Sequence, residues 1–239
     1  MKAVRIEAYQ PVAQYNIPGW TKRRRTYPLP PYSTVIGMVH AACGWKTYHP
    51  MCVSVSGSGM LNSGNIVMYW NGGTTAMTET EDFKKRFPVR VQGKTADGRT
   101  EYTGWVRGPR IEDYMADVKL VLHVIPEREE DVEKIYNGML HPERYLSLGR
   151  HEDSLRVDNV VKTEIRERVV RWKEGWYYVP AHKTGPILPG TVYSLNKSYS
   201  VSKCRRIFTK VRATLVEPNP EWPLTYAYAD EDDTPMFLA

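Results

Sequence analysis

The residues best suited to bind an anion lie close to the start of a predicted helix, after a run of four cations, Lys22 to Arg25. The Pro-Leu-Pro-Pro segment at 28–31 keeps the residues before it out of the helical region, so the helix is expected to begin after it, with Ser33 or Thr34 as its cap. A helix N-terminus presents free N–H groups and the positive end of the helix dipole. With arginines alongside, this helix start predicts a phosphate site, and ordinary capping without a ligand is the alternative.

A second candidate is the segment Leu146-Ser-Leu-Gly-Arg-His-Glu-Asp153, in which Arg150 and His151 follow a glycine and precede two carboxylates. Arg150 could hold a phosphate, and His151 could act as a general acid or base. The alternative is a turn held together by ion pairs, without a ligand.

The net positive charge is concentrated between residues 84 and 110. This segment carries eight cations and two carboxylates, a surplus of six that equals the formal net charge of +6 of the whole chain. Phe83, Phe87, Tyr102 and Trp105 are interleaved with the cations. Cations that meet phosphates and rings on which bases stack are typical of a surface for single-stranded RNA, while a solvated hairpin is the alternative. The cations are Lys84, Lys85, Arg86, Arg90, Lys94, Arg99, Arg107 and Arg110.

Other motifs of catalysis or cofactor binding are absent from the sequence. None of the six histidines has metal-ligand spacing, and no P-loop, dinucleotide fingerprint or serine-hydrolase elbow occurs. The pair Gly57-Ser-Gly59 lacks a third glycine and a following helix, and His40 and His123 are expected to have structural roles. The three cysteines indicate neither a disulfide framework nor a zinc site. No metal and no cofactor is therefore predicted.

The composition is that of a globular protein. At 239 residues, 41% hydrophobic and 25% charged, the chain can bury a sizeable core. No apolar run reaches the ~18 to 20 residues of a bilayer span, and the N-terminus alternates like a strand rather than a signal peptide. We expect a cytoplasmic protein without a membrane partner. Residues 217–239 carry six carboxylates and no Lys or Arg, and this acidic tail is expected to be solvated.

The elements that must position these residues begin as strand, helix, strand, basic excursion, strand and helix. This order predicts the start of a β-α-β-β-α-β unit, and thus a ferredoxin-like α+β fold. The predicted ranges are 2–9 (strand), 33–44 (helix), 51–60 (strand), 66–70 (short strand ended by a turn at 71–73), 75–115 (projecting basic hairpin, with turns at 92–94 and 97–99), 117–125 (buried strand) and 127–140 (helix).

The rest of the chain predicts further strands. A fourth strand of the unit is expected within 145–161, and short β-rich segments separated by Gly and Pro turns follow from about 160 to 216. The expected division is a first domain at 1–155 and a β-rich C-terminal region with the acidic tail at 156–239.

Two motifs in combination resemble a known family. Pro28-Leu-Pro-Pro-Tyr-Ser-Thr-Val-Ile-Gly-Met-Val-His-Ala-Ala-Cys-Gly-Trp45 and Tyr145-Leu-Ser-Leu-Gly-Arg-His-Glu-Asp153 are similar to those of the fifth-numbered family of CRISPR-associated (Cas) proteins, in its type I-B-like branch. The resemblance implies a ferredoxin-like (RRM-like) RAMP domain with a protruding β-hairpin thumb, drawn here from about 75–115, and a small C-terminal antiparallel β region.

The resemblance also implies a function in antiviral defence or RNA-guided DNA targeting. Such proteins bind the 5′ handle of the CRISPR RNA (crRNA) at one end of the Cascade complex. They contact its backbone subunit and its large, PAM-reading subunit, and reach target DNA only through the complex. The predicted RNA-binding residues of this chain are Arg23, Arg24, Arg25, Tyr27, Tyr32, Ser33, Thr34, Lys84, Lys85, Arg86, Arg90, Arg107, Arg110, Arg150 and His151.

One branch of this family also cleaves the precursor RNA, and the resemblance points there to a Tyr near the end of the first helix and a Lys-His doublet. This sequence has Cys43-Gly44 at the helix end and no Lys-His dipeptide, so a non-catalytic subunit is expected. The alternative is a metal-independent endoribonuclease, with His151 or His182 as acid or base and Lys183 or Arg150 stabilising the scissile phosphate.

Overall fold

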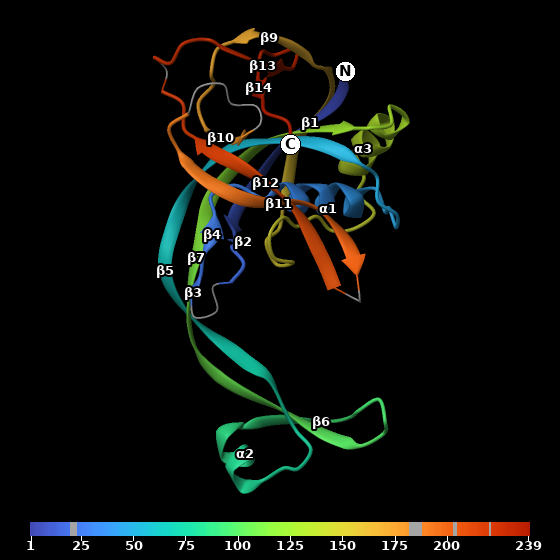
Figure 1. Cartoon of the computed structure of the whole chain (residues 1–239), viewed down its shortest axis with the longest axis vertical. Coiled ribbons are helices and arrows are strands. Elements are labelled where there is room, and N and C mark those ends of the chain that lie inside the picture. Colours follow the sequence, from blue (N-terminus) through green and yellow to red (C-terminus); the bar gives the residue numbers. More distant parts are fainter. Residues whose placement is uncertain (20–22, 182–187, 203–204, 220) are drawn as a thin grey trace. The chain divides into compact units, whose positions relative to one another are not determined.

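The computed structural model describes residues 1–19, 23–181, 188–202, 205–219 and 221–239, which form two units (Figure 1). Unit 1 comprises Met1–Ile17, Arg25–Asn62 and Tyr114–Ala239, and unit 2 comprises Pro18–Arg24 and Ser63–Asp113. Two long strands, β5 (Met51–Ala76) and β7 (Thr100–Pro126), contribute residues to both units.

Unit 1 is built on a β-α-β-β-α-β succession. Its elements are β1 (Lys2–Ala13), α1 (Tyr32–Ala42), β5, β7, α3 (Glu130–Leu140) and β8 (Arg156–Glu164). The strands lie in the order β5-β7-β1-β8, and β1 is antiparallel to both of its neighbours. Ile6 of β1 lies between Leu122 and Val160, so apolar residues of three strands align across the sheet. The predicted order of elements is thus confirmed.

The same sheet continues beyond β5 with strands from the C-terminal half of the chain. The order is β11-β12-β10-β5, formed by β10 (Trp176–Pro180), β11 (Thr191–Ser202) and β12 (Arg205–Val216). Two smaller sheets pair β2 (Tyr15–Asn16) with β4 (Thr26–Tyr27), and β9 (Arg166–Val170) with β13 (Thr225–Ala229) and β14 (Pro235–Met236). The domain boundary at 155/156 stays a prediction, although hydrogen bonds join residues from both sides of it into one sheet.

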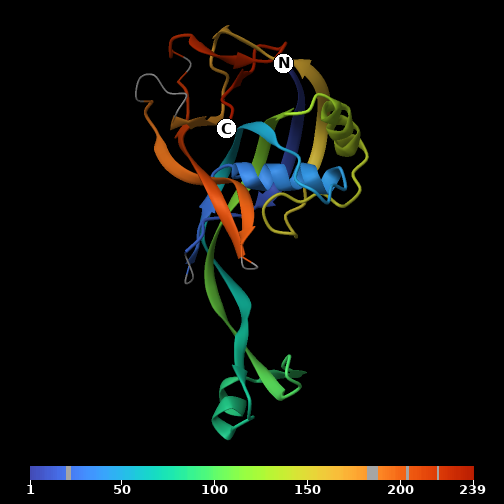
Figure 2. The ribbon, with the colours of Figure 1, turned by 45° about the vertical axis from the view of Figure 1, so that its right-hand side comes forward.

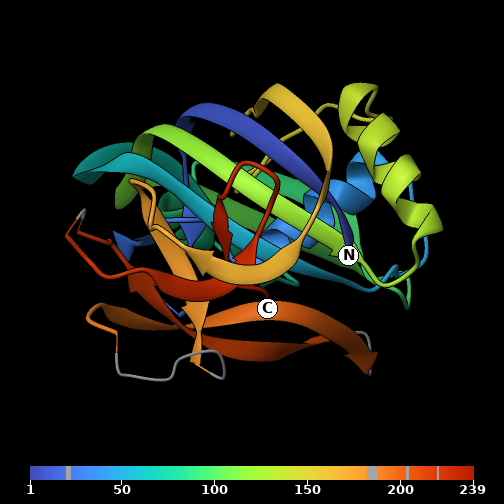
Figure 3. The same ribbon diagram turned by 90° about the horizontal axis from the view of Figure 1, so that it is seen from above.

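Both faces of the main sheet are covered. Along β10 the buried side chains alternate, because successive residues of a strand point to opposite faces. Tyr178 packs in the core that contains α1 and α3, whereas Tyr177 and Val179 pack in a second core with residues of β9 and β13. Figure 3 shows the small sheet of β9, β13 and β14 in front of the main sheet. The helices and the small sheet therefore stabilise opposite faces.

Helix α1 begins at Tyr32, one residue before the predicted range, with Pro31 at its N-cap position and no side chain as a cap. The Pro31 carbonyl accepts from the N–H groups of Thr34, at 2.9 Å, and Val35, at 3.3 Å. The prediction that Ser33 or Thr34 caps the helix is wrong. Pro31 takes the cap position because its fixed φ and extended ψ of 151° already lead the chain into the first turn.

Gly37 is an exposed residue in the middle of α1, and a Cβ added there would have no atom within 4 Å. We expect Gly37→Ala to raise the free energy of unfolding by about 0.5 to 1 kcal/mol, because glycine loses more backbone entropy than alanine in a helix. Urea titration followed by circular dichroism would measure the change. A value at or below that of the parent protein would contradict the assignment of open space around this residue.

In unit 2, the parts of β5 and β7 lie side by side, with β3 (Arg23–Arg24) parallel to β7 and β6 (Val89–Lys94) antiparallel to it. A short helix, α2 (Glu81–Arg86), was not predicted. Thr80 is its N-cap residue, and the Thr80 hydroxyl oxygen accepts from the N–H of Phe83 at 3.2 Å. Figure 1 shows α2 and β6 together in this unit.

Two turns predicted in this region are wrong. The Asn71-Gly72-Gly73 segment lies inside β5, which therefore replaces the two separate strands expected at 51–60 and 66–70. A Cβ on Gly72 would lie 1.8 Å from the Trp105 ring, so this glycine makes room for an aromatic side chain of the neighbouring strand. Gly93 likewise lies within β6. The turn predicted at Asp97-Gly98-Arg99 is confirmed: Gly98 has a φ of +82° and the Thr95 N–H donates to the Arg99 carbonyl at 2.9 Å.

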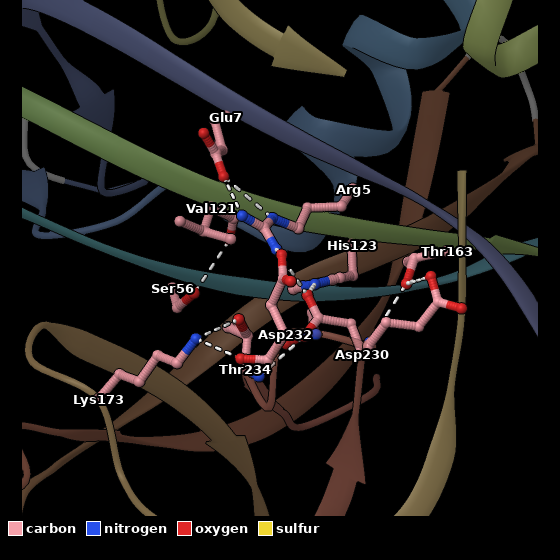
Figure 4. A network of polar contacts seen from close by, with 12 residues as sticks. Arg5, Glu7, Ser56, Val121, His123, Thr163, Lys173, Asp230, Asp232 and Thr234 are labelled. Carbon is pink, nitrogen blue, oxygen red and sulfur yellow. Dashed lines mark hydrogen bonds and ion pairs between the residues drawn. The ribbon is translucent and has the colours of Figure 1, made fainter. Parts of the chain in front are cut away.

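The prediction of a solvated acidic tail is wrong for Asp230 and for residues 234–237 and 239, which are buried, whereas Glu231, Asp232 and Asp233 are exposed as expected. Asp230 is fully buried, and its carboxylate accepts from Nε2 of His123 at 3.0 Å and from Nη1 of Arg5 at 3.2 Å (Figure 4). Phe237 stacks on Trp172 with ring centroids 5.0 Å apart. The apolar residues after the carboxylates are what the sequence interpretation overlooked, and their burial draws Asp230 into the core.

Candidate nucleic-acid interface

The predicted cluster of arginines is divided between the two units. Arg23 and Arg24 belong to unit 2, whereas Arg25 and helix α1 belong to unit 1. Arg23 donates from Nη2 to Oδ1 of Asp113 at 2.9 Å, and Nη1 of Arg24 lies 3.5 Å from Oε1 of the buried Glu112. Arg23 and Arg24 therefore compensate buried carboxylates of their own unit.

The contact between Arg23 and Asp113 changes the pKa of the Asp113 carboxyl. Burial raises the pKa of its carboxyl, but the Arg23 guanidinium, the Gly64 N–H and the Ser63 hydroxyl together outweigh burial and hold the pKa below its ordinary value. Asp113 is therefore ionised at neutral pH, and part of the positive charge of Arg23 is neutralised by it.

Two of the predicted RNA-binding tyrosines are core residues. Tyr32 is fully buried and packs edge-on against Tyr178, with ring centroids 6.0 Å apart, and Tyr27 is buried against Tyr193 at 5.5 Å. Burial raises the pKa of both hydroxyls. Their burial corrects the prediction that these rings lie against RNA, since a ring enclosed by its own core has no face left for a base. The helix start presents the half-buried Ser33 and Thr34 instead.

The basic residues of unit 2 fall into two groups. Lys84 pairs with Glu81 at 2.9 Å, and Arg90 pairs with Glu79 at 2.6 Å. Arg110 lies over the Tyr69 ring at 4.5 Å and donates to Oδ1 of Asn71 at 2.9 Å. The side chains of the exposed Lys85, Arg86 and Arg107, by contrast, make no hydrogen bond or ion pair with any residue that the structure describes, although the Arg86 guanidinium lies over the Phe87 ring at 5.3 Å. Together with the exposed Lys94, they are the cations of this unit whose side chains are available to a phosphate.

The aromatic residues between these cations hold unit 2 together. Phe87 is buried beneath Gly104, where a Cβ would lie 2.4 Å from its ring, and it packs against Phe83 at 4.9 Å. Trp105 covers Gly72 across the β5–β7 pair. The predicted combination of cations and freely stacking rings is therefore only half realised: the cations are exposed, while Phe87 and Trp105 serve packing.

The segment at 145–153 forms a turn around the buried Asp153. The Asp153 carboxylate accepts from Nη2 of Arg150 at 2.7 Å, from the Arg150 N–H at 2.9 Å and from the Gln14 N–H at 2.8 Å. Gln10 of β1 donates to the Leu148 carbonyl at 2.9 Å, which ties the turn to the sheet. His151 is almost fully exposed, and among the described residues its side chain pairs only with Glu152, at 2.8 Å. The geometry is that of the ion-paired turn considered as the alternative.

A groove of about 820 Å³ in unit 1 was not predicted. It is lined by one side of α1, by the loop after it and by the β11–β12 hairpin, which Figure 2 shows crossing α1. Lys197, Tyr199, Arg206 and Phe208 line it from the hairpin. The sequence does carry a signal for these residues, since cations alternate with aromatic rings in 197–208, but that signal has meaning only once the two strands are paired.

The other candidates are the buried histidine of the core and possible metal ligands. His123 donates to Asp230 in the core, where burial lowers its pKa, so the structural role predicted for His123 is confirmed. Among the described residues, no group of His, Cys, Asp and Glu is arranged to hold a metal ion, and no helix has the length and apolar character needed to cross a bilayer. His182 and Lys183, named for the endoribonuclease alternative, lie outside the described residues, as does Lys22.

Comparison with known proteins gives a consistent set of similarities. The family described as "CRISPR-associated protein (Cas_Cas5)" matches residues 3–183. A chain of a "CRISPR RNA-guided surveillance complex" is similar in fold, with a TM-score of 0.56 and 16% identity over 97% of this chain and 92% of that one. A "Cas protein" has a TM-score of 0.48 and 13% identity over 98% of both chains. A "CRISPR protein from Archaeoglobus fulgidus" has a TM-score of 0.42 and 11% identity over 100% of this chain and 99% of that one. No curated protein matches the sequence.

Proposed function

The chain belongs to the CRISPR-associated Cas5 family, and from this premise we propose that it is the subunit of a Cascade complex that binds the 5′ handle of the crRNA without cutting it. The observation that carries the proposal is the set of exposed, unpaired cations on unit 2 in a member of this family. Phosphates are the ligands that such cations attract most strongly, and a polyanion meets several of them at once.

The sheet order supports the finer fold assignment. Four strands in the order β5-β7-β1-β8, with helices after the first and third of them along the chain, are arranged as in a ferredoxin-like (RRM-like) RAMP domain. In this proposal the basic residues 75–115 belong to the thumb. RRM-like sheets and the elements around them are common platforms for unpaired RNA.

Partner subunits are part of the proposal. Along β5, Ile66, Met68 and Trp70 alternate on one face of unit 2, and each is at least half exposed. Contiguous exposed apolar side chains of this kind are typical of protein interfaces. We assign this face to the Cascade backbone subunit; the large subunit is proposed as the second protein neighbour, with the complex working in the cytoplasm of a prokaryotic cell.

The proposal of a non-catalytic role depends on the end of α1, where Cys43-Gly44 stand in place of the tyrosine of the cleaving branch. The Cys43 thiol is not activated, because burial raises its pKa to about 11. Incubation of the purified protein with repeat RNA in EDTA tests this point. Specific cleavage that His151→Ala abolishes would replace the proposal with the endoribonuclease alternative.

Binding through unit 2 predicts a change in salt dependence. We expect the variant Lys85→Ala, Arg86→Ala, Arg107→Ala to bind handle RNA more weakly. We also expect the slope of log K against log salt to fall by about two, because each phosphate contact on a single strand contributes roughly 0.7 to that slope. Fluorescence anisotropy at several salt concentrations measures both quantities.

The matched control removes three cations that are already paired within unit 1, Arg156, Lys162 and Arg166, which contact Asp158, Glu133 and Glu164. It changes the net charge equally, so a similar loss of affinity in the control would show that only total charge matters. An unchanged slope in the unit 2 variant would remove these residues from the interface.

A further inference from the structure

The groove of unit 1 has the charge of a polyanion site. Its lining includes Lys46, Arg144, Lys197 and Arg206 and, among the described residues, no Asp or Glu. Lys46, Arg144 and Lys197 make no hydrogen bond or ion pair with the described part of the chain. Lys197 lies where the register of β11 and β12 shifts, as in a β-bulge. Four cations in one groove, with no acidic partner among the described residues, give it a positive potential that attracts phosphates.

Aromatic rings in the same groove are exposed and held in place from behind. Tyr48 is 55% exposed and stacks on His40, with ring centroids 5.6 Å apart and an interplanar angle of 28°. Tyr199 is 48% exposed, and it is flanked by the Arg206 guanidinium at 4.7 Å and by the Phe208 ring at 5.7 Å. Because these neighbours restrict each ring, little side-chain entropy is lost when a ligand stacks on its free face.

Strand pairing explains why the hairpin presents this set of residues. Tyr199 lies directly opposite Phe208, and Val201 lies opposite Arg206. Residues two apart on a strand share a face, so all four side chains point to the same side of the hairpin. That side lines the groove together with α1.

We propose that this groove holds unpaired nucleotides of the RNA, with bases stacked on Tyr48 and Tyr199 and phosphates beside Lys46, Lys197 and Arg206. The inference rests on the proposed function and adds a second RNA surface, on unit 1, to the one on unit 2. Stacking on a side chain needs a base whose face is free, so the ligand is single-stranded. A protein partner would require acidic groups opposite four cations and is the competing occupant.

The test uses the full chain and a fluorescein-labelled single-stranded RNA of about ten nucleotides, a length that such sites accommodate. The same strand annealed to its complement is the second ligand. We expect Tyr48→Ala and Tyr199→Ala each to weaken binding of the single strand about tenfold, and Tyr→Phe at either position to restore it, because the ring is retained. Binding of the duplex is expected to stay unchanged in all four variants.

The control variant is Tyr145→Ala, which removes an exposed tyrosine outside the groove and is expected to bind as the parent does. The salt slope separates the two kinds of contact: it is expected to stay constant in the tyrosine variants and to fall in Lys197→Ala. Melting curves followed by circular dichroism identify any variant that fails to fold. If an alanine variant does not fold, the test uses the RNA affinities of the Tyr→Phe variant and of Lys197→Ala instead.

Parent-like affinity of both alanine variants for the single strand would overturn the inference. So would variants that bind RNA normally but no longer co-purify with another Cascade subunit, because the groove would then be a protein interface. In both cases loss of binding in the unit 2 variant would still uphold the proposed function. A parent protein that binds neither ligand would instead contradict the proposed function itself.

Discussion

Replacement of Asp230 by asparagine is expected to lower the free energy of unfolding by about 3 to 5 kcal/mol, the range for breaking a buried ion pair on one side. The Asp230 carboxylate accepts four hydrogen bonds: from His123 at 3.0 Å, from Arg5 at 3.2 Å, and from the N–H groups of Thr234 at 2.8 Å and Asp232 at 3.1 Å (Figure 4). An amide cannot balance the charge of Arg5, and one of its two polar atoms is a donor. The end of the chain would lose its anchor.

Asp232→Asn is the matched control. Asp232 also contacts Arg5, but its side chain is 68% exposed, and we expect a loss below about 1 kcal/mol, as for surface ion pairs. Guanidinium unfolding of both variants, followed by circular dichroism, makes the comparison. Equal losses would show that the burial of Asp230 has no special consequence.

The Asp230 effect should depend on pH. Burial raises the pKa of this carboxyl, but the contacts with His123, the Thr234 N–H and Arg5 outweigh burial, so in the folded state the pKa lies below its ordinary value. A lowered pKa contributes stability that is present above the unfolded pKa of about 3.9 and is lost as the pH falls below it. The difference between Asp230→Asn and the parent should therefore be constant from about pH 5 to pH 7 and shrink below about pH 4.

Gly57→Ala is expected to lower the free energy of unfolding by about 3 kcal/mol, at the upper end of the range for overpacking. A Cβ on Gly57 would lie 2.2 Å from the Lys119 carbonyl oxygen of β7 and 3.0 Å from Cδ2 of Leu120. A backbone carbonyl cannot turn away without breaking the pairing of β7 with β5. The strain would fall on the centre of the main sheet.

Gly59→Ala provides the comparison on the same strand. Its Cβ would lie 3.3 Å from the nearest atoms, which include the flexible end of Met115, so we expect a loss of roughly 1 kcal/mol. Thermal melts of the two variants decide the point. A Gly57 variant that melts at or above the Gly59 variant would show that the strands can move apart here.

The Gly57-Ser-Gly59 segment shows what a sequence pattern can predict and what it cannot. The sequence argued against a phosphate loop here because a third glycine is lacking, and the segment lies inside β5. The physical reason for Gly57 is the backbone carbonyl of Lys119, more than sixty residues away. A one-dimensional pattern cannot show such a contact. Asp230 is a similar case, because its segment is acidic by composition and buried only through its distant partners, Arg5 and His123.

Features that depend on neighbouring residues were predictable from the chain alone: the two longer helices, the alternating strands, the β-α-β-β-α-β order and the two motifs typical of the family. Helical and strand periodicities are local, so they appear directly in the sequence. Whether a side chain is accessible to a ligand depends instead on residues that are distant in the sequence. Tyr32 is a core residue because it packs against Tyr178, and the turn of Asp153 is held by Gln10 and Gln14; in each case the contact joins residues more than 130 positions apart. The groove between α1 and the β11–β12 hairpin exists for the same reason: burial of apolar side chains joins segments more than 150 residues apart, and only that joining places Tyr48 and Tyr199 on one surface.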